Sequence, residues 1–220
     1  MTPKSEFLGS AVAEYVARNA TPPDELLRDL AEYTAGLGQL GRMQISPEQG
    51  TFMGMLAQLI RPQFAVEVGT FTGYSAICVA RALAPGGRLL CCDISEEWTK
   101  VARDYWERAH LADRIELRLA PAAQTLRALP EHPHVDLAFI DADKRGYADY
   151  WAELVPRMRP GGVILVDNVL WSGRIVEETD TDPDTIALRE FGELVRADAR
   201  VEHVLVPIGD GLTMARRTGS

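Results

Sequence analysis

The sequence contains few cysteines, and they do not form a pattern. Cys78, Cys91 and Cys92 are odd in number, lie in apolar stretches and lack the spacing of zinc ligands. This argues against both a disulfide framework and a zinc module. Neighbouring residues of a strand point to opposite faces, which disfavours a bond between Cys91 and Cys92. We therefore interpret all three as small buried hydrophobic residues.

The chain also lacks an excess of basic charge and any long apolar run. Its 220 residues include 32 acids against 23 lysines and arginines, a formal net charge of −9. This balance argues against nucleic-acid and anionic-membrane partners, both of which need a basic surface, and favours a small-molecule partner. The opening stretch 1–6 has no signal-peptide apolar core. We expect a cytoplasmic protein with no membrane partner and one domain over residues 1–220.

Two apolar stretches end in acidic residues. Val135–Ile140 is followed by Asp141, and Gly161–Val166 is followed by Asp167 and Asn168. Unalternating apolar runs are typical of parallel strands buried on both faces. Ligands of such sheets bind outside the carboxyl ends of the strands, so the three polar side chains should converge. Oxygen donors of this kind suit Mg²⁺, although an aspartate at a strand end also commonly caps a helix or turns the chain.

A glycine-containing turn follows another apolar stretch, Phe64–Gly69. Gly69 permits a close backbone approach to a ligand, and Gly73 permits close packing of the next helix. The strand that follows ends at Asp93, where folds of this type place a carboxylate on ribose hydroxyls. Asp93 has a second interpretation, which is to turn the chain into a helix capped by Ser95. The turn itself lacks a complete G-x-G-x-x-G, so it is a weak signal when taken alone.

Helical and strand patterns alternate about five times along the chain. This alternation predicts an α/β fold with a doubly wound, mostly parallel sheet of seven strands. Gly209–Gly211 joins the last two strands in a hairpin, so the final strand should be antiparallel. We expect residues 1–61 to form a helical cap and residues 62–220 a Rossmann-like core. The acidic stretch Glu177–Asp184 is typical of a mobile surface loop.

Taken together, these motifs resemble the cation-dependent catechol and caffeoyl-CoA O-methyltransferases. This family belongs to the class I enzymes that use S-adenosylmethionine (SAM), and the resemblance covers nearly the whole chain. The stretches that carry it are Glu67–Ser75, the strand ending at Asp93, Phe139–Lys144 and Asp167–Gly173. As a set they are highly specific, whereas each alone is not.

The resemblance implies a SAM site. Ser75 would contact the methionine end, Asp93 the ribose, Ala122 the adenine through its main chain, and Asp143 the region of the amino group. Many relatives have threonine where this chain has Ile45, so we expect that position to act through its backbone. The residues assigned to SAM are Met43, Ile45, Glu67, Gly69, Thr70, Ser75, Asp93, Ala122, Asp141 and Asp143.

The resemblance also implies a metal site and a general base. Asp141, Asp167 and Asn168 match the ligands of Mg²⁺, or of another divalent cation such as Mn²⁺ or Ca²⁺. Lys144 matches the proposed base. A free phenol has a pKa of about 10 and is mostly protonated at neutral pH, so the nucleophile must be generated in the site. Near a cation and a sulfonium the ammonium form of Lys144 is disfavoured, whereas arginine cannot deprotonate at all.

The implied reaction is methylation of one hydroxyl of a small catechol or vicinal-diol substrate by a homodimeric enzyme. Lys144, Trp171 and Ser172 would face that substrate, but many plant members have asparagine where this chain has Ser172. A plant-like substrate does not follow. Two other functions fit parts of the pattern. The first is an NAD-dependent oxidoreductase, which would explain the two glycines and Asp93 but would leave Asp141, Asp167 and Asn168 without a role. The second is a catalytically silent SAM-binding protein, which would bind SAM without turnover.

Overall fold

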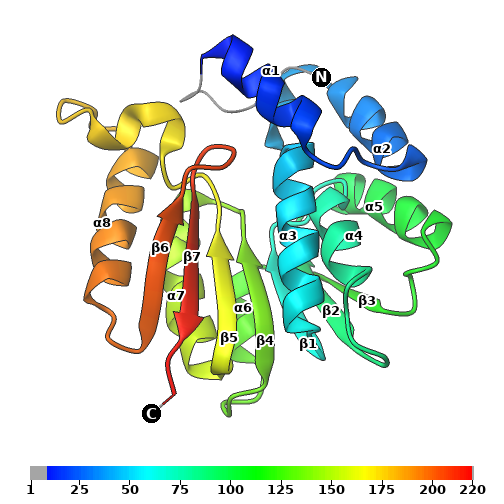
Figure 1. Ribbon diagram of the computed structural model, residues 1–220. Helices are drawn as coiled ribbons and strands as arrows, with labels where there is room; N and C mark the ends of the chain where they lie inside the picture. Colours follow the sequence, from blue (N-terminus) through cyan, green and yellow to red (C-terminus); the bar gives the residue numbers. More distant parts are fainter. Residues whose placement is uncertain (1–8, 220) are drawn as a thin grey trace.

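The computed structural model describes residues 9–219, so the expectation about the opening stretch 1–6 lies outside the described residues. Its centre is one seven-stranded sheet (Figure 1). The strands are β1 (Phe64–Val68), β2 (Arg88–Asp93), β3 (Ile115–Leu119), β4 (Val135–Ile140), β5 (Met158–Val166), β6 (Val201–Val206) and β7 (Leu212–Arg217).

The strand order is β3-β2-β1-β4-β5-β7-β6. Neighbours from β3 to β5 pair in parallel, whereas β7 runs antiparallel to both β5 and β6. Six strands therefore share one direction, and the last strand of the chain opposes them. This confirms the predicted doubly wound α/β sheet with an antiparallel final strand.

Helices cover both faces of the sheet. They are α1 (Ser10–Asn19), α2 (Glu25–Ala35), α3 (Pro47–Ile60), α4 (Tyr74–Ala80), α5 (Glu96–Arg108), α6 (Ala122–Arg127), α7 (Tyr147–Leu154) and α8 (Pro183–Ala197). In Figure 1, α1 and α2 lie beyond the end of the sheet to which β5 points. Among the helices described, none has the length and apolar character needed to cross a bilayer.

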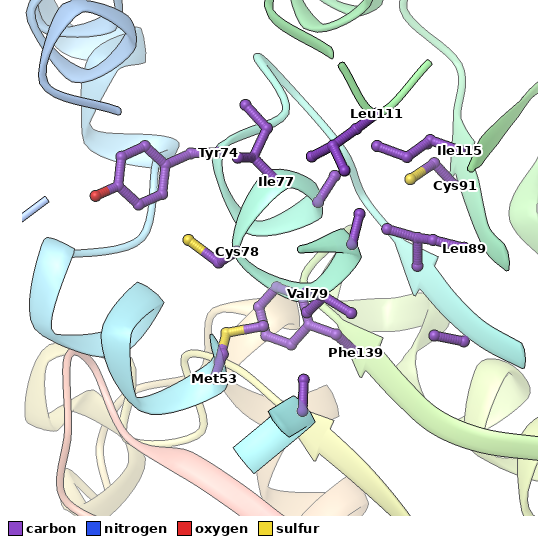
Figure 2. Close-up of a cluster of buried hydrophobic side chains, with 14 of the residues drawn as sticks. Met53, Tyr74, Ile77, Cys78, Val79, Leu89, Cys91, Leu111, Ile115 and Phe139 are labelled. Atoms are coloured by element: carbon purple, nitrogen blue, oxygen red, sulfur yellow. The ribbon is translucent and has the colours of Figure 1, made fainter. Parts of the chain in front are cut away.

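Two hydrophobic clusters hold these layers together. One packs helices α2, α3, α4 and α5 against one face of the sheet and includes Met53, Ile77 and Phe139 (Figure 2). The other packs helices α6, α7 and α8 against the opposite face and includes Trp151 and Phe191. Strands buried on both sides explain why apolar residues run without alternation in the central part of the sequence.

The three cysteines follow the same arrangement. All are free and buried. Cys91 belongs to the first cluster, whereas its neighbour Cys92 belongs to the second, so the two thiols lie on opposite faces of β2. The interpretation of these residues as small buried hydrophobes is confirmed.

Two local predictions are wrong. The sequence of residues 41–45 predicts a loop, but residues 41–43 belong to a 3-10 helix, Gly38–Met43. The sequence also predicts a helix from about Tyr147 to Met158. In the structure this helix ends at Leu154, and a 3-10 turn containing Pro156 follows because proline interrupts helical hydrogen bonding. Met158 instead pairs with Val135 and begins β5, which is therefore longer than its apolar part.

Candidate functional site

The candidate site lies at the carboxyl ends of β4 and β5. Ile140 and Val166 are partners in the parallel register, so Asp141 and Asp167 leave the sheet side by side. The backbone N–H of Asp167 donates to the carbonyl of Ile140 at 2.9 Å, which continues the ladder into the site. The convergence expected from two neighbouring strands is thus observed.

A buried lysine lies within this group of oxygens. The Nζ atom of Lys144 donates to Asp141 Oδ1 at 3.2 Å and to Asn168 Oδ1 at 2.6 Å. It also donates to the carbonyl of Ala142 at 3.0 Å and to the hydroxyl of Tyr147 at 2.7 Å. The amino group of Lys144 therefore lies between two of the predicted metal ligands.

Asp167 is the most buried of these ligands. Burial, and next the charge of Asp141, raise the pKa of Asp167 well above its usual value, while the side chain of Gln49 and the charge of Lys144 act in the opposite direction. Its Oδ1 accepts the backbone N–H of Asn168 at 2.7 Å. Asn168 has φ of 58°, in the left-handed region that asparagine tolerates better than most residues. Sequence reasoning missed Gln49, which is 1% exposed and lies on α3.

The donor set has the chemistry of a hard-cation site. It provides two carboxylates and one amide oxygen, which are the ligand types that Mg²⁺, Mn²⁺ and Ca²⁺ prefer. The described residues include no group of three or more His, Cys, Asp or Glu side chains arranged to hold a metal. Here the third donor is an asparagine. The observation that supports a fit to a cation is that the side-chain oxygens of Asp141 and Asn168 point to one place, where both accept from Lys144 Nζ.

The glycine turn between β1 and α4 approaches this group closely. Gly69 has φ of 90°, and a Cβ at that position would lie 1.9 Å from the carbonyl oxygen of Asp141. Only glycine fits this position without a shift of the backbone. The turn is tied to β2, because Oδ2 of Asp93 accepts the backbone N–H groups of Thr70 and Phe71, each at 2.9 Å.

Asp93 also turns the chain. Its Oδ1 accepts the backbone N–H of Ser95 at 2.8 Å, and the Ser95 hydroxyl in turn caps α5 by accepting from Trp98 N. The structural interpretation of Asp93 is therefore confirmed. Its contact with a ribose stays a prediction.

Beneath the glycine turn lies a buried carboxyl group. Glu67 is 1% exposed, and burial raises its pKa to about 8, although the Cys91 thiol donates to its Oε1 at 3.6 Å. Within residues 9–219, Glu67 Oε2 and Thr70 Oγ1 have no hydrogen-bond partner. Unsatisfied buried polar atoms are rare in folded proteins, and here two of them lie together in the predicted SAM site.

Other residues assigned to SAM come from separate segments. Met43 is exposed at the end of its 3-10 helix, Ile45 is buried before α3, and Ala122 is buried at the start of α6. Their side chains carry no hydrogen-bonding group other than a thioether, so contact would come from backbone or apolar surface. Asp143 is exposed, and its Oδ1 accepts the hydroxyl of Tyr150 at 2.5 Å.

The segment after β5 forms one side of the site. The ring of Trp171 lies 5.6 Å from Lys144 Nζ, and the backbone N–H of Ser172 donates to Asp210 Oδ1 at 2.6 Å. The acidic stretch that follows is more firmly tied than the prediction of a mobile loop implied. Arg174 pairs with Asp180 at 2.6 Å, and Arg189 of α8 donates to two carbonyls of the stretch and to two just before it.

Comparison with known proteins identifies the family. A family profile described as O-methyltransferase matches residues 17–218. The mouse catechol O-methyltransferase domain-containing protein 1 is 36% identical, with 92% of this chain and 78% of that protein aligned. The caffeoyl-CoA O-methyltransferase of Mesembryanthemum crystallinum is 33% identical, over 97% of this chain and 89% of that protein.

Solved structures agree with the sequence matches. The crystal structure of an O-methyltransferase from Bacillus cereus in complex with SAH superposes with a TM-score of 0.84. The two sequences are 34% identical, and the alignment covers 94% of this chain and 97% of the Bacillus cereus chain. The range that the family profile matches, residues 17–218, includes the whole sheet and α2. The chain therefore belongs to the class I, SAM-dependent O-methyltransferase family, in the group that contains the caffeoyl-CoA and catechol enzymes.

Proposed function

We propose that this protein transfers the methyl group of SAM to one hydroxyl of a small catechol or vicinal-diol aromatic substrate, with the help of a divalent cation. The observation that carries the proposal is the position of Lys144 Nζ, which lies between Asp141 and Asn168. A proton acceptor and cation-binding oxygens thus lie within hydrogen-bond distance of one another. The names of the relatives, which specify catechol or caffeoyl-CoA, support the substrate class.

We propose that SAM binds along the glycine turn. Glu67, Gly69, Thr70, Ser75 and Asp93 would form its principal contacts. The unpartnered Glu67 Oε2 and Thr70 Oγ1 support this, as does the SAH bound by the Bacillus cereus relative. SAM supplies an activated methyl group when bound. The further contacts that we propose are Met43, Ile45, Ala122, Asp141 and Asp143.

Asp141, Asp167 and Asn168 would hold the divalent cation, Mg²⁺ or alternatively Mn²⁺ or Ca²⁺. A cation of this kind lowers the pKa of coordinated hydroxyl groups and orients two vicinal oxygens. The protein's own contribution is rigidity, since Asp167 is anchored by Asn168 N–H and the two strands fix both carboxylates. Fixing the reacting groups in this way contributes several kcal/mol to catalysis.

Lys144 would accept the proton of the attacking hydroxyl at Nζ. The side chain is buried, so water competes little for that proton. The Trp171 ring lies 5.6 Å from Nζ and would cover the bound substrate on one side. Ser172, next to it, is exposed and fixed through its backbone to Asp210, which suits a residue that selects among substrates.

We propose further that the whole chain works as one methyltransferase domain, with residues 1–61 as a helical cap over the core at 62–220. We propose a homodimer acting in the cytoplasm. Support for association comes from α3, where Met55 and Leu59 are 60% and 84% exposed on one helical face. Exposed apolar stripes of this kind commonly mark contact surfaces.

The test of the function uses purified enzyme, SAM and a panel of catechols that includes free acids and CoA esters. We expect methylated product with Mg²⁺, no product in EDTA, and recovery when Mg²⁺ is restored. Asp141→Ala and Asp167→Ala should lower turnover by about 100-fold or more, because the charge stabilisation supplied by the cation is lost. SAH binding, measured by calorimetry, should largely survive in Asp167→Ala, because Asp167 is not among the proposed SAM contacts.

Asp113→Ala provides the control, because Asp113 is an exposed aspartate in the turn before β3. This variant should retain the parent's turnover. Unchanged rates in EDTA would exclude the cation-assisted reaction. Failure to methylate any catechol in Mg²⁺, with SAH still bound, would favour the silent SAM-binding alternative.

A further inference from the structure

Helix α7 carries two tyrosines whose hydroxyl groups bond to two consecutive residues of the site. Tyr147 contacts Lys144, and Tyr150 contacts Asp143. We propose that α7 is a positioning element in which Tyr147 orients the proton acceptor and Tyr150 orients the acid nearest the SAM amino group. This inference rests on the proposed function, because it takes the roles of Lys144 and Asp143 from it.

The Tyr147 hydroxyl donates one hydrogen bond and accepts another. Its hydroxyl donates to the backbone carbonyl of Asp167 at 3.1 Å and accepts from Lys144 Nζ at 2.7 Å. A phenolic hydroxyl has one proton, so donation to Asp167 leaves its oxygen lone pairs for Lys144. Tyr147 thereby connects the lysine to the end of β5, the strand that provides Asp167 itself.

The ring of Tyr147 is held as firmly as its hydroxyl. The residue has no exposed surface, and its ring contacts Phe191 of α8 edge to face, with centroids 5.6 Å apart. Trp151 contacts the same phenylalanine from the next turn of α7. A lysine side chain is flexible, so a fixed partner at its tip restricts the positions that Nζ can occupy. The packing of the Tyr147 ring in the core therefore restricts the position of Lys144 Nζ.

Tyr150 has a different acceptor. Its hydroxyl donates to Asp143 Oδ1, and both groups crowd around Gly146. A Cβ on Gly146 would lie 2.6 Å from the Tyr150 hydroxyl oxygen and 2.7 Å from Asp143 Oδ2. A side chain at that position would displace the pair. Asp143 is otherwise exposed, so this contact orients a carboxylate that solvent would leave free.

Helical spacing explains how one element serves both groups. Tyr147 and Tyr150 are three residues apart and therefore lie on neighbouring parts of the same helix face. Asp143 and Lys144 precede α7 across the short 3-10 turn Lys144–Gly146. Each tyrosine thus reaches back to one of two adjacent residues, and the two contacts can be removed separately.

The experiment compares Tyr147→Phe and Tyr150→Phe with the parent enzyme in Mg²⁺. Tyr147→Phe should lower kcat about 10-fold or more, as loss of an orienting contact does, while the KM for SAM and the Kd for SAH change less than about twofold. Tyr150→Phe should instead weaken SAH binding about three- to tenfold, the effect of one lost hydrogen bond. Calorimetry measures SAH binding independently of turnover.

The matched control is Tyr105→Phe. Tyr105 lies on α5 and donates to Asp29 at 3.2 Å, outside the site. We expect it to leave kcat, KM and Kd as in the parent. Thermal unfolding of all three variants measures stability separately. A lower Tm for Tyr147→Phe with unchanged kcat would reduce Tyr147 to a core residue and overturn its positioning role.

Combining Tyr147→Phe with Lys144→Ala tests this inference separately from the proposed function. Lys144→Ala should be nearly inactive, and adding Tyr147→Phe to it should cost no more activity, since the tyrosine acts through the lysine. Full activity of Lys144→Ala would overturn the base assignment and the role of Tyr147 together. Inactive Lys144→Ala with fully active Tyr147→Phe would overturn the inference alone.

One further variant guards against misfolding of Tyr147→Phe. Phe191→Leu keeps both hydroxyls but loosens the ring contact of Tyr147. It should lower kcat and leave SAH binding unchanged. If Tyr150→Phe binds SAH as tightly as the parent does, the proposed role of Tyr150 in orienting Asp143 is overturned.

Discussion

At the scale of single residues, burial changes the ionisation of Glu67. Glu67 lies within the sheet with one carboxyl oxygen unpartnered among the described residues. Removing a carboxylate from water disfavours its charged form, so the pKa of Glu67 rises from 4.5 to about 8. The folded protein therefore keeps a proton on Glu67 at pH values at which the unfolded chain releases it.

This difference predicts the pH dependence of stability. Between about pH 4.5 and pH 8 the folded state binds more protons than the unfolded state, so the free energy of unfolding falls as pH rises through that window. Glu67→Gln removes the effect. Its Tm relative to the parent should increase from pH 5.5 to pH 9, by an amount corresponding to at most a few kcal/mol, since each pKa unit is worth about 1.4 kcal/mol.

The measurement is thermal unfolding in EDTA without SAM. Glu97→Gln, an exposed first-turn residue of α5, is the control and should show no such trend. A constant difference in Tm between Glu67→Gln and the parent at all pH values would contradict the raised pKa.

At the scale of elements, α8 supports the segment that we propose to border the substrate. Arg189 donates to the carbonyls of Ile175 at 3.0 Å, Asp180 at 2.8 Å and Arg174 at 3.1 Å, and also to that of Glu177. One guanidinium thus satisfies four backbone acceptors, two in the 3-10 helix Trp171–Val176 and two in the stretch that follows it. Its five N–H donors in a rigid plane make arginine suited to this task, whereas lysine has a single point of charge.

Arg189→Ala should release this segment and with it Trp171 and Ser172. We expect the KM for the catechol to rise several-fold, SAH affinity to stay constant, and stability to fall by about 1 kcal/mol because partly buried acceptors lose their donor. Kinetics, calorimetry and limited proteolysis of residues 174–182 measure these effects. Arg196→Ala, on the same helix but in an exposed pair with Glu193, should change none of them. A parent-like KM would show that the segment does not shape the substrate site.

At the scale of the whole molecule, the proposed homodimer has a direct test. Light scattering after gel filtration should give twice the mass of one chain. Leu59→Glu, which places a charge on the exposed face of α3, should reduce this mass towards that of a single chain. Leu119→Glu, in edge strand β3, should have no effect on it. A parent enzyme with the mass of one chain would refute the dimer.

Much of this architecture was predictable from local sequence patterns. Unalternating apolar runs identified the buried strands, and acids at the ends of two of them indicated where the site forms. The residues that support the site gave no such signal. Tyr147 and Gln49 have the appearance of ordinary helix residues, and Arg189 is one arginine among many in an arginine-rich chain. Their roles depend on partners distant in the sequence or on other elements.

The sequence by itself determined the order of strands and helices and the residue types at the sheet edge, because both follow from periodicity and from the chemistry of individual side chains. Only the tertiary structure decided which groups meet. It brought Lys144 between Asp141 and Asn168, and it tied Asp93 to the amides of the glycine turn. The physical reason is that hydrogen bonds and burial depend on distances across the sheet, which local patterns do not specify.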